Sequence, residues 1–588
     1  MKIRTLKKMI AAALVVTSAP VLAGKADIQL ETLMDGYWDK HLKSSPMMAS
    51  YLGDTSYSDR LDDLSEKGFA ERTANLDLAI AELKKIPVKE LSDANRVNYE
   101  VFEWMVHNER KTLDYDWRSI TFNTVMGWQT SFAQIVGGMT TFNSEDDYRA
   151  YLKRLEAFGT YADQNMALMQ KGIEVGYVQP CETLNGYEAS ISGFIAATPE
   201  QSLFYAPFNR IPASYGDEVI SELQAKGKQL VSDVVNPAYQ RYNTFFTKTY
   251  KPACRNTIGL SAIPKGRELY DHFVRYYTTM DTDADAVHTL GLSEVKRIRA
   301  EMEAIMKEVG FEGDLKAFFA HLRTDPQFYP KTEEEFLAKA ATLAKRIDGK
   351  LPEYFSYLPR NPYGIQPVPA HIAPKTAAGY YQGGAADGTR AGVYFLNTYN
   401  LKSRPLYTLA ALTLHEGVPG HHQQISIAGE LDSLPKFRRS YYFHAYGEGW
   451  GLYSEYLGEE MGIYDTPYDR FGRLSYEMWR ALRLVVDSGM HAKGWSRQQA
   501  IDFMADNSAL SLHNITSEVD RYITYPGQAL AYKNGELKIR ELRGKAEQAL
   551  GKHFSLRKFH TLVLKSGAVP LTVLESIVDS WIAEQKKA

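Results

Sequence analysis

The stretch Leu406–Ile425, LYTLAALTLHEGVPGHHQQI, joins an apolar run to several residues of metal-binding type. The run predicts a buried helix that ends near His415 and Glu416. In the common zinc-protease motif, two histidines lie four residues apart on one helical face, and the glutamate between them activates water. Here the residue four positions after His415 is Pro419, which cannot bind a metal. A metal site at this segment therefore requires a departure from the common motif.

The spacing of the histidines sets a geometric condition. In a continuous helix, His421 would lie about 240° around the axis from His415. His422 would return to the same face but about 10 Å further along, too far to share one ion. Pro419 and Gly420 must therefore interrupt the helix if His415 and His421 are to converge. The sequence favours His421 as the second ligand and places His422 in the cleft wall or in a nearby hydrogen bond, but the choice between them stays open.

A third ligand is expected from the helical segment His444–Glu455. A catalytic zinc ion usually takes three protein ligands and one water, and Glu448 is the candidate here. Glu455 follows seven residues later on roughly the same face, where it could bind the second ring nitrogen of a ligating histidine. Glu416 would then activate a water whose pKa the metal lowers.

Residues 518–535, EVDRYITYPGQALAYKNG, offer groups that could contact a substrate. Attack of water on a carbonyl creates an oxyanion, which a hydrogen-bond donor beside the metal must stabilise. Tyr532 is the preferred donor and Tyr525 the second choice. Arg521 is the candidate cation for a substrate carboxylate, which it could hold by two parallel hydrogen bonds.

The segment Glu477–Trp495 predicts a long helix between these clusters. Arg480, Arg483 and Asp487 share one face of it, and His491 follows one turn later. A buried network of ion pairs is the first interpretation of this face. The alternative brings His491 against the metal ligands or the substrate.

The rest of the chain indicates a mainly helical protein. Apolar residues recur at spacings of three and four within residues 76–85, 97–113, 148–172, 292–309, 315–323 and 333–347. Prolines suppress helix between residues 358 and 397, where 378–382 and 392–397 predict two short strands. An exposed edge of this small sheet could bind a peptide by backbone pairing, and Asn397 at its end is a candidate contact for substrate or metal ligands. We expect one helical domain over residues 24–588, with lobes at about 24–250 and 251–588.

The first residues have the pattern of a secretory signal. Four basic residues precede the apolar run 9–21, and small residues predict cleavage after Ala23. Residues 1–23 are therefore expected to direct the chain to the periplasm or out of the cell. No later stretch of about 18 apolar residues predicts a membrane span. The formal net charge of −3 argues against a nucleic-acid partner, which usually requires a basic stripe.

The two cysteines of the chain are Cys181 and Cys254. In an oxidising compartment they could form one disulfide. They could equally be two separate buried thiols, because sequence does not show whether their Cα atoms are close enough.

The motifs around the histidines resemble those of the domain-of-unknown-function 885 family. The matching blocks are residues 380–397, 415–422, 448–455, 483–491 and 521–532. This family in turn resembles helical zinc peptidases such as thimet oligopeptidase, angiotensin-converting enzyme and the carboxypeptidase Taq type. The resemblance implies a deep cleft between two helical lobes and one Zn²⁺ ion per chain.

The same resemblance assigns roles to individual residues. His415, His421 and Glu448 correspond to the metal ligands of those peptidases, and Glu416 corresponds to their water-activating base. Tyr532 corresponds to their catalytic tyrosine. The spacing between the two histidines is two residues longer here than in those enzymes.

We therefore predict zinc-dependent hydrolysis of peptide bonds in short peptides, with carboxypeptidase or dipeptidase action suggested by Arg521. Two alternatives stay open: a non-catalytic periplasmic peptide-binding protein on a peptidase scaffold, and a metal-dependent hydrolase of non-peptide amides. Glu416 argues against the first, because a metal-binding relic would not need a base. Manganese, cobalt or nickel could replace zinc among nitrogen and oxygen ligands.

Overall fold

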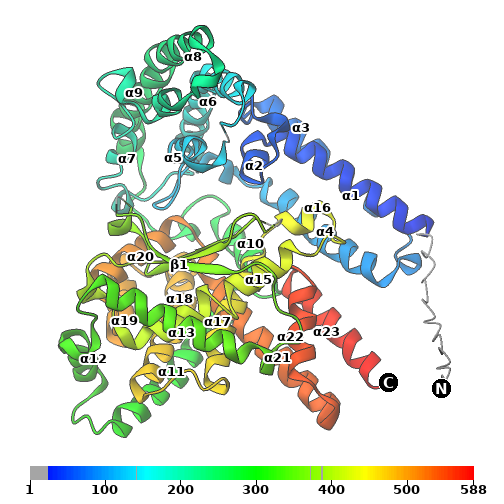
Figure 1. Ribbon diagram of the computed structural model, residues 1–588, viewed down its shortest axis with the longest axis vertical. Coiled ribbons are helices and arrows are strands. Elements are labelled where there is room, and N and C mark those ends of the chain that lie inside the picture. The colour runs from blue at the N-terminus through cyan, green and yellow to red at the C-terminus, as the bar shows by residue number, and fades with distance from the viewer. Residues whose placement is uncertain (1–23, 141, 371, 386–387, 588) are drawn as a thin grey trace, which may run out of the picture.

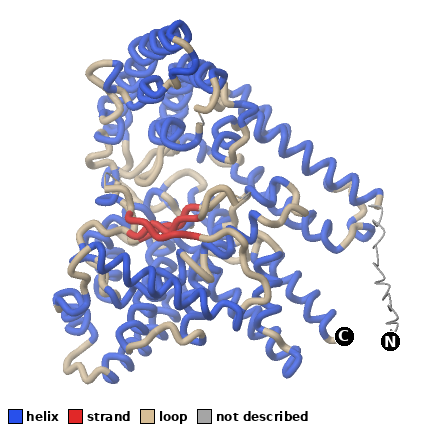
Figure 2. The backbone as a smooth tube through the Cα atoms, in the orientation of Figure 1, coloured by secondary structure: helices blue, strands red, loops and turns tan. Residues whose placement is uncertain are grey.

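The computed structural model describes residues 24–140, 142–370, 372–385 and 388–587, so the expected signal segment lies outside the described residues. The described chain is mainly helical with one small sheet, which confirms the predicted fold class (Figure 2). Within these ranges, no helix combines the length and the apolar character needed to cross a membrane.

The six segments with helical periodicity coincide with helices α3, α4, α6, α11, α12 and α13, and the segments 76–85, 97–113 and 292–309 extend one or two residues past the helix ends. The helices of the first half are α1 (Lys25–Ser44), α2 (Pro46–Tyr51), α3 (Glu66–Leu83), α4 (Asp93–Thr112), α5 (Trp128–Gln134), α6 (Glu145–Val175), α7 (Ala189–Ser192), α8 (Asp217–Leu230), α9 (Asn236–Phe245), α10 (Gly266–Thr278) and α11 (Ala284–Glu308). Those of the second half are α12 (Leu315–Thr324), α13 (Glu333–Tyr354), α14 (Leu409–Glu416), α15 (His421–Gly429), α16 (Lys436–Ser440), α17 (His444–Glu460), α18 (Pro467–Ala492), α19 (Arg497–Asn507), α20 (Leu512–Thr524), α21 (Ala531–Leu550), α22 (Leu556–Lys565) and α23 (Leu571–Gln585).

Helix α18 runs through the middle of the C-terminal part and is buried along most of its length (Figure 1). A capping box starts it, because the Thr466 hydroxyl accepts from the Asp469 amide at 3.1 Å and the Asp469 carboxylate accepts from the Thr466 amide at 2.9 Å. The neighbouring α11 approaches closely at Gly291, where a Cβ would lie 2.7 Å from the Cβ of Leu484. Helix α18 carries one wall of the site described below.

Helices α5–α9 form one end of the molecule around an aromatic core (Figure 1). The rings of Phe132 and Phe158 stack there at a centroid distance of 4.0 Å. Another core joins residues 26–106 to residues 347–582, so the first helices pack with the C-terminal part. The division into lobes at about residue 250 stays a prediction.

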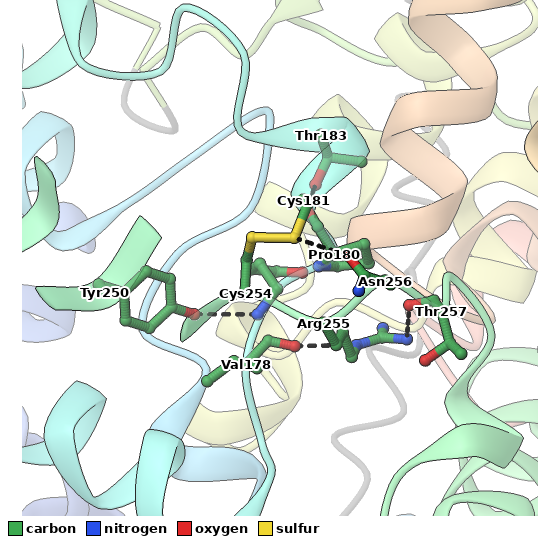
Figure 3. Close-up of a disulfide and its surroundings, with 10 residues drawn as sticks. Val178, Pro180, Cys181, Thr183, Tyr250, Cys254, Arg255, Asn256 and Thr257 are labelled. Carbon is green, nitrogen blue, oxygen red and sulfur yellow. Dashed lines mark hydrogen bonds between the residues drawn. A yellow bond between two sulfur atoms is a disulfide. The ribbon is translucent and has the colours of Figure 1, made fainter. Parts of the chain in front are cut away.

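A disulfide joins Cys181, which follows α6, to Cys254, which follows α9 (Figure 3). The two Cα atoms lie 5.1 Å apart, and the Cys181 amide donates to the Arg255 carbonyl at 2.9 Å. Of the two interpretations that the sequence left open, the structure shows the disulfide.

The sheet has the strand order β1-β3-β2, with β1 at Tyr363–Pro367, β2 at Gly379–Gln382 and β3 at Gly392–Leu396. Strand β2 pairs with β3 in antiparallel register and β1 pairs with β3 in parallel register. The sequence predicted β2 and β3 but not β1, because Pro367 ends β1 and proline is a strand breaker outside edge positions. Strand β1 is such an edge.

Candidate metal centre

The chain breaks its helix between the two histidines, as the spacing requires. Helix α14 ends at Glu416, residues 417–420 form a turn with a cis Val418–Pro419 peptide bond, and α15 begins at His421. The Gly420 amide donates to the Leu414 carbonyl at 3.0 Å, which folds the turn back onto the end of α14. A Cβ at Gly420 would lie 2.0 Å from the His415 carbonyl oxygen, so this turn requires glycine.

As a result, ligand atoms of His415, His421 and Glu448 all lie within 4.8 Å of one another. The Nε2 atoms of His415 and His421 lie 3.6 Å and 3.5 Å from the same Glu448 oxygen, Oε2. In a tetrahedral zinc site with bonds of roughly 2.0–2.1 Å, neighbouring ligand atoms are about 3.3–3.4 Å apart. The three side chains therefore fit one small ion with little movement. Two imidazole nitrogens and one carboxylate oxygen suit zinc and related transition metals.

Small residues bring α17 close to this cluster. A Cβ at Gly451 would lie 2.7 Å from the His415 ring, so glycine makes room for that imidazole. The indole nitrogen of Trp450 donates to the Pro419 carbonyl at 2.7 Å and ties α17 to the turn. The close packing of α17 therefore places Glu448 next to His415 and His421.

Glu455 lies behind His415, with Oε1 2.8 Å from Nδ1 of the ring, as the seven-residue spacing predicted. This contact leaves Nε2 of His415 directed toward Glu448. Burial alone would lower the pKa of His415, but the carboxylates of Glu448 and Glu455 raise it to about 9. Burial alone would raise the pKa of Glu448, but the two histidines hold it well below its ordinary value. The negative charge of the Glu448 and Glu455 carboxylates therefore favours a cation at this centre.

A cavity of about 1150 Å³ opens in front of the cluster. It exceeds the roughly 300–1000 Å³ of small-molecule pockets and has room for a peptide. His415, Glu416, His421 and Glu448 line it together with residues of other elements. They include Gly379, Tyr380 and Tyr381 of β2, Tyr476, Trp479, Arg480 and Arg483 of α18, and Tyr532 of α21, and residues of α2, α15 and α16 also line it.

Tyr532 lines this cavity, and the Arg483 guanidinium lies over its ring at 4.4 Å from the centroid. Burial and the charge of Glu448 raise the pKa of Tyr532, so its hydroxyl keeps its proton and can donate. Tyr442 also lines the cavity. Sequence reasoning missed Tyr442, whose only signal was its place two residues before α17.

Several predicted site residues have other positions. Arg521 is not among the cavity-lining residues; its guanidinium donates to Glu518 at 2.9 Å and to Gln528 at 2.7 Å. Tyr525 does not line the cavity either, and its ring packs edge-on against Tyr277 at 5.8 Å. Neither side chain is placed to contact a substrate in this cavity.

Two more candidates, His491 and Asn397, bind backbone groups of neighbouring segments. His491 is fully buried, with Nδ1 3.1 Å from the Leu260 amide and Nε2 2.9 Å from the Tyr522 carbonyl. The side-chain amide of Asn397 donates to the carbonyls of residues 373, 376 and 377 and holds the segment before β2. Both contacts are structural, and the structure brings neither residue to the metal ligands.

His422 lies outside the ligand cluster. Its Nδ1 is 2.9 Å from the Tyr381 hydroxyl, and its ring packs on Tyr363 at 4.4 Å. The geometry therefore favours His421 over His422 as the second ligand.

The predicted ion-pair network of α18 is present in part. Arg483 pairs with Glu518 at 3.1 Å, and Arg480 lies 3.6 Å from Glu455. Asp487 is not a member, since its carboxylate accepts from the Tyr270 hydroxyl at 2.6 Å and from the Gly527 amide at 3.1 Å.

Comparison with known proteins adds a family and a fold. The family model described as "Bacterial protein of unknown function (DUF885)" matches residues 46–578. A crystal structure from Colwellia psychrerythraea, provisionally described as a lipoprotein, is 28% identical with a TM-score of 0.86, covering 95% of this chain and 99% of that chain. A structure from Shewanella oneidensis, provisionally described as a lipoprotein of unknown function, is 18% identical with a TM-score of 0.75, covering 93% of this chain and 99% of that chain.

A structure of Pz peptidase A with an inhibitor is 14% identical, with a TM-score of 0.33, covering 88% of this chain and 97% of that chain. A search of curated proteins gives no match.

Proposed function

The chain belongs to the DUF885 family of bacterial proteins, and we propose that it is a zinc-dependent peptidase acting on short peptides. His415, His421 and Glu448 would hold one ion, since their ligand atoms lie within 4.8 Å of one another. That convergence on the wall of a large cavity, with Glu416 beside it, is the observation that carries the proposal.

When bound, zinc polarises the substrate carbonyl and lowers the pKa of water. Glu416 lines the cavity directly after His415 and is the base that takes a proton from the attacking water. The water oxygen forms a C–O bond to the carbonyl carbon, whose own oxygen becomes an oxyanion. Glu416 then gives its proton to the amide nitrogen, so that the C–N bond breaks, the carbonyl reforms and the amine leaves. The Tyr532 hydroxyl donates a hydrogen bond to the oxyanion.

Strand β2 supports a peptide substrate over a non-peptide amide. It lies at an edge of the sheet, and Gly379, Tyr380 and Tyr381 line the cavity. An edge strand offers unpaired backbone groups to an extended peptide, which could bind as a further strand. The carboxylate of Glu416 in the same cavity favours catalysis over peptide binding alone.

The decisive experiment measures metal content by mass spectrometry and cleavage of a mixed peptide library. We expect about one zinc per chain in the wild type and in Glu416→Gln, with cleavage lost in the variant. Absence of metal from both proteins after reconstitution with zinc would overturn the proposal. Full cleavage by a zinc-loaded Glu416→Gln variant would remove Glu416 from its role.

We also propose that the protein is exported to the periplasm or beyond. The signal-like pattern of residues 1–23 supports this, as does the disulfide, because disulfides persist in oxidising compartments. N-terminal sequencing of protein from fractionated cells tests it, with Gly24 expected as the first residue. An unprocessed cytoplasmic chain would contradict it.

A further inference from the structure

The cavity wall formed by α18 carries Arg480 close to the metal ligands. The Nη2 atom of Arg480 lies 3.6 Å from Oε1 of Glu455, the same oxygen that lies 2.8 Å from Nδ1 of His415. One carboxylate therefore separates this guanidinium from a ligand ring. An extended residue spans about 3.3–3.6 Å, so an anion on Arg480 would be one or two residues away from a carbonyl at the metal centre.

Arg480 is buried without a full set of acceptors. Its side chain is 8% exposed and sits among the rings of Tyr476, Trp479 and Tyr532, with centroids 4.8, 5.0 and 5.9 Å from its Cζ atom. Its Nη1 donates to the Tyr476 carbonyl at 3.3 Å, but within the described part of the chain its Nε has no hydrogen-bond partner. Buried donors are costly to leave unpaired, so this group is prepared for an acceptor.

The carboxylates nearest to Arg480 and Arg483 are shared with other groups. Glu518 accepts hydrogen bonds from both Arg483 and Arg521, at 3.1 Å and 2.9 Å. Glu455, the carboxylate nearest to Arg480, is shared with His415. Arg483 and Arg521 thus share one carboxylate, and Arg480 shares another with the His415 ring. A substrate carboxylate would give the Arg480 guanidinium an acceptor that it does not have to share.

The other arginines on the cavity wall have partners of their own, and for Arg483 this partner is Glu518 at 3.1 Å. Arg360 lies 3.3 Å from Glu430, and Arg439 lies 3.7 Å from Asp432. Arg438 donates to Asn98 at 2.8 Å and to the Ser566 carbonyl. Arg480 differs from these arginines because it lies beside the metal ligands and because Glu455, its nearest carboxylate, also binds His415.

We propose that Arg480 binds a carboxylate of the substrate, so that the preferred substrates are peptides with a free C-terminal carboxylate one or two residues beyond the cleaved bond. This inference rests on the proposed peptidase function. The guanidinium offers two parallel N–H groups to a carboxylate, and the three rings hold its plane and exclude water. Arg480 takes the role that sequence reasoning gave to Arg521.

The test compares a peptide acid with the matching C-terminal amide in wild type, Arg480→Gln and Arg480→Lys. We expect the wild type to prefer the acid, and Arg480→Gln to lower kcat/KM for the acid about 100-fold with little change for the amide. Arg480→Lys should restore part of the preference, because it keeps the charge but not the fork. As a matched control, Arg521→Gln should affect acid and amide equally. Equal loss for both substrates in Arg480→Gln would overturn the proposal.

Binding separates this subsite from the catalytic proposal. Calorimetry with zinc-loaded Glu416→Gln should show tighter binding of the acid than of the amide, and the additional change Arg480→Gln should abolish the difference. Zinc content checks that Arg480→Gln keeps the metal; if it does not, Arg480→Lys is the variant to compare. A binding preference without any cleavage by the wild type would keep the subsite and reject the peptidase. Cleavage without any preference for the acid would do the reverse.

Discussion

The Nδ1 atom of His415 lies 2.8 Å from Oε1 of Glu455, a carboxylate 40 residues further along the chain. Both side chains are almost fully buried, on α14 and α17 respectively. A hydrogen bond of this kind fixes the ring orientation and directs the other nitrogen, Nε2, toward an ion. Glu455 would thus position His415 for the proposed metal ion without being a ligand itself.

This arrangement predicts a weaker metal site when Glu455 is replaced. Glu455→Gln should raise the zinc dissociation constant by about 10–100-fold, because the neutral amide no longer makes the ring nitrogen a stronger ligand. Competition with a chelator of known affinity measures the change. Glu459→Gln, on the same helix but away from His415, is the control. Unchanged zinc affinity in Glu455→Gln would show that the contact is only structural.

The two adjacent histidines give a second prediction. His421→Ala should abolish stoichiometric zinc binding, since it removes one of three ligands, whereas His422→Ala should keep about one zinc per chain. Metal analysis of both purified variants decides the matter. If His422→Ala loses the ion and His421→Ala keeps it, the ligand assignment is wrong.

Local patterns in the sequence predicted many of the helices and the break between α14 and α15. Helical periodicity located α3, α4, α6, α11, α12 and α13, and the turn after Glu416 follows from Pro419 and Gly420 alone. The contact between Glu455 and His415 also follows from spacing. Glu455 lies seven residues after Glu448, so both side chains are on the face of α17 that is turned toward His415. Features that depend on 3.6-residue periodicity or on helix-breaking residues were therefore predictable.

The cavity wall was not predictable, because it depends on how distant elements pack. Arg521 and Arg480 are both arginines near aromatic residues in the sequence. Only the fold shows that Arg521 pairs with Glu518, whereas Arg480 lines the cavity. Tyr442 likewise reaches the cavity through the packing of α17, which no local pattern encodes. The pairing of Cys181 with Cys254 is a third case, since 73 residues separate them.

Tyr532 gives a third prediction. Tyr532→Phe should lower kcat by about 100–1000-fold with a small change in KM, because the lost hydrogen bond stabilises the oxyanion more than the bound substrate. Tyr525→Phe is the matched control, since that ring lies against Tyr277 and does not line the cavity. Steady-state kinetics on one peptide measures both variants. A loss confined to KM in Tyr532→Phe would assign the hydroxyl to substrate binding instead.

The disulfide gives a fourth prediction. The double substitution Cys181→Ser and Cys254→Ser should lower the free energy of unfolding by about 2–5 kcal/mol, because the cross-link restricts the unfolded chain. Guanidinium denaturation under non-reducing conditions measures the loss. Wild type treated with reductant should approach the variant. Equal stability of the oxidised protein and the variant would contradict the expected contribution.

Asp487 gives the last prediction, which concerns pH. Burial raises the pKa of this carboxyl to about 7 in the folded protein, despite its hydrogen bonds with Tyr270 and Gly527. The folded state therefore holds this proton more tightly than the unfolded chain does. The stability it contributes is complete below about pH 4, declines as the pH rises to about 7, and is constant above that.

Asp487→Asn should remove this dependence, since its amide oxygen can still accept from Tyr270 and Gly527 while the group stays neutral. The variant should gain stability relative to wild type as the pH rises from 4 to 7, by on the order of 3 kcal/mol, and gain no more above pH 7. Unfolding midpoints at several pH values measure the difference. Asp506→Asn, at an exposed position, should shift stability by nearly the same amount at every pH. A difference between Asp487→Asn and wild type that does not grow over this range would show that the carboxyl is already ionised in the folded protein.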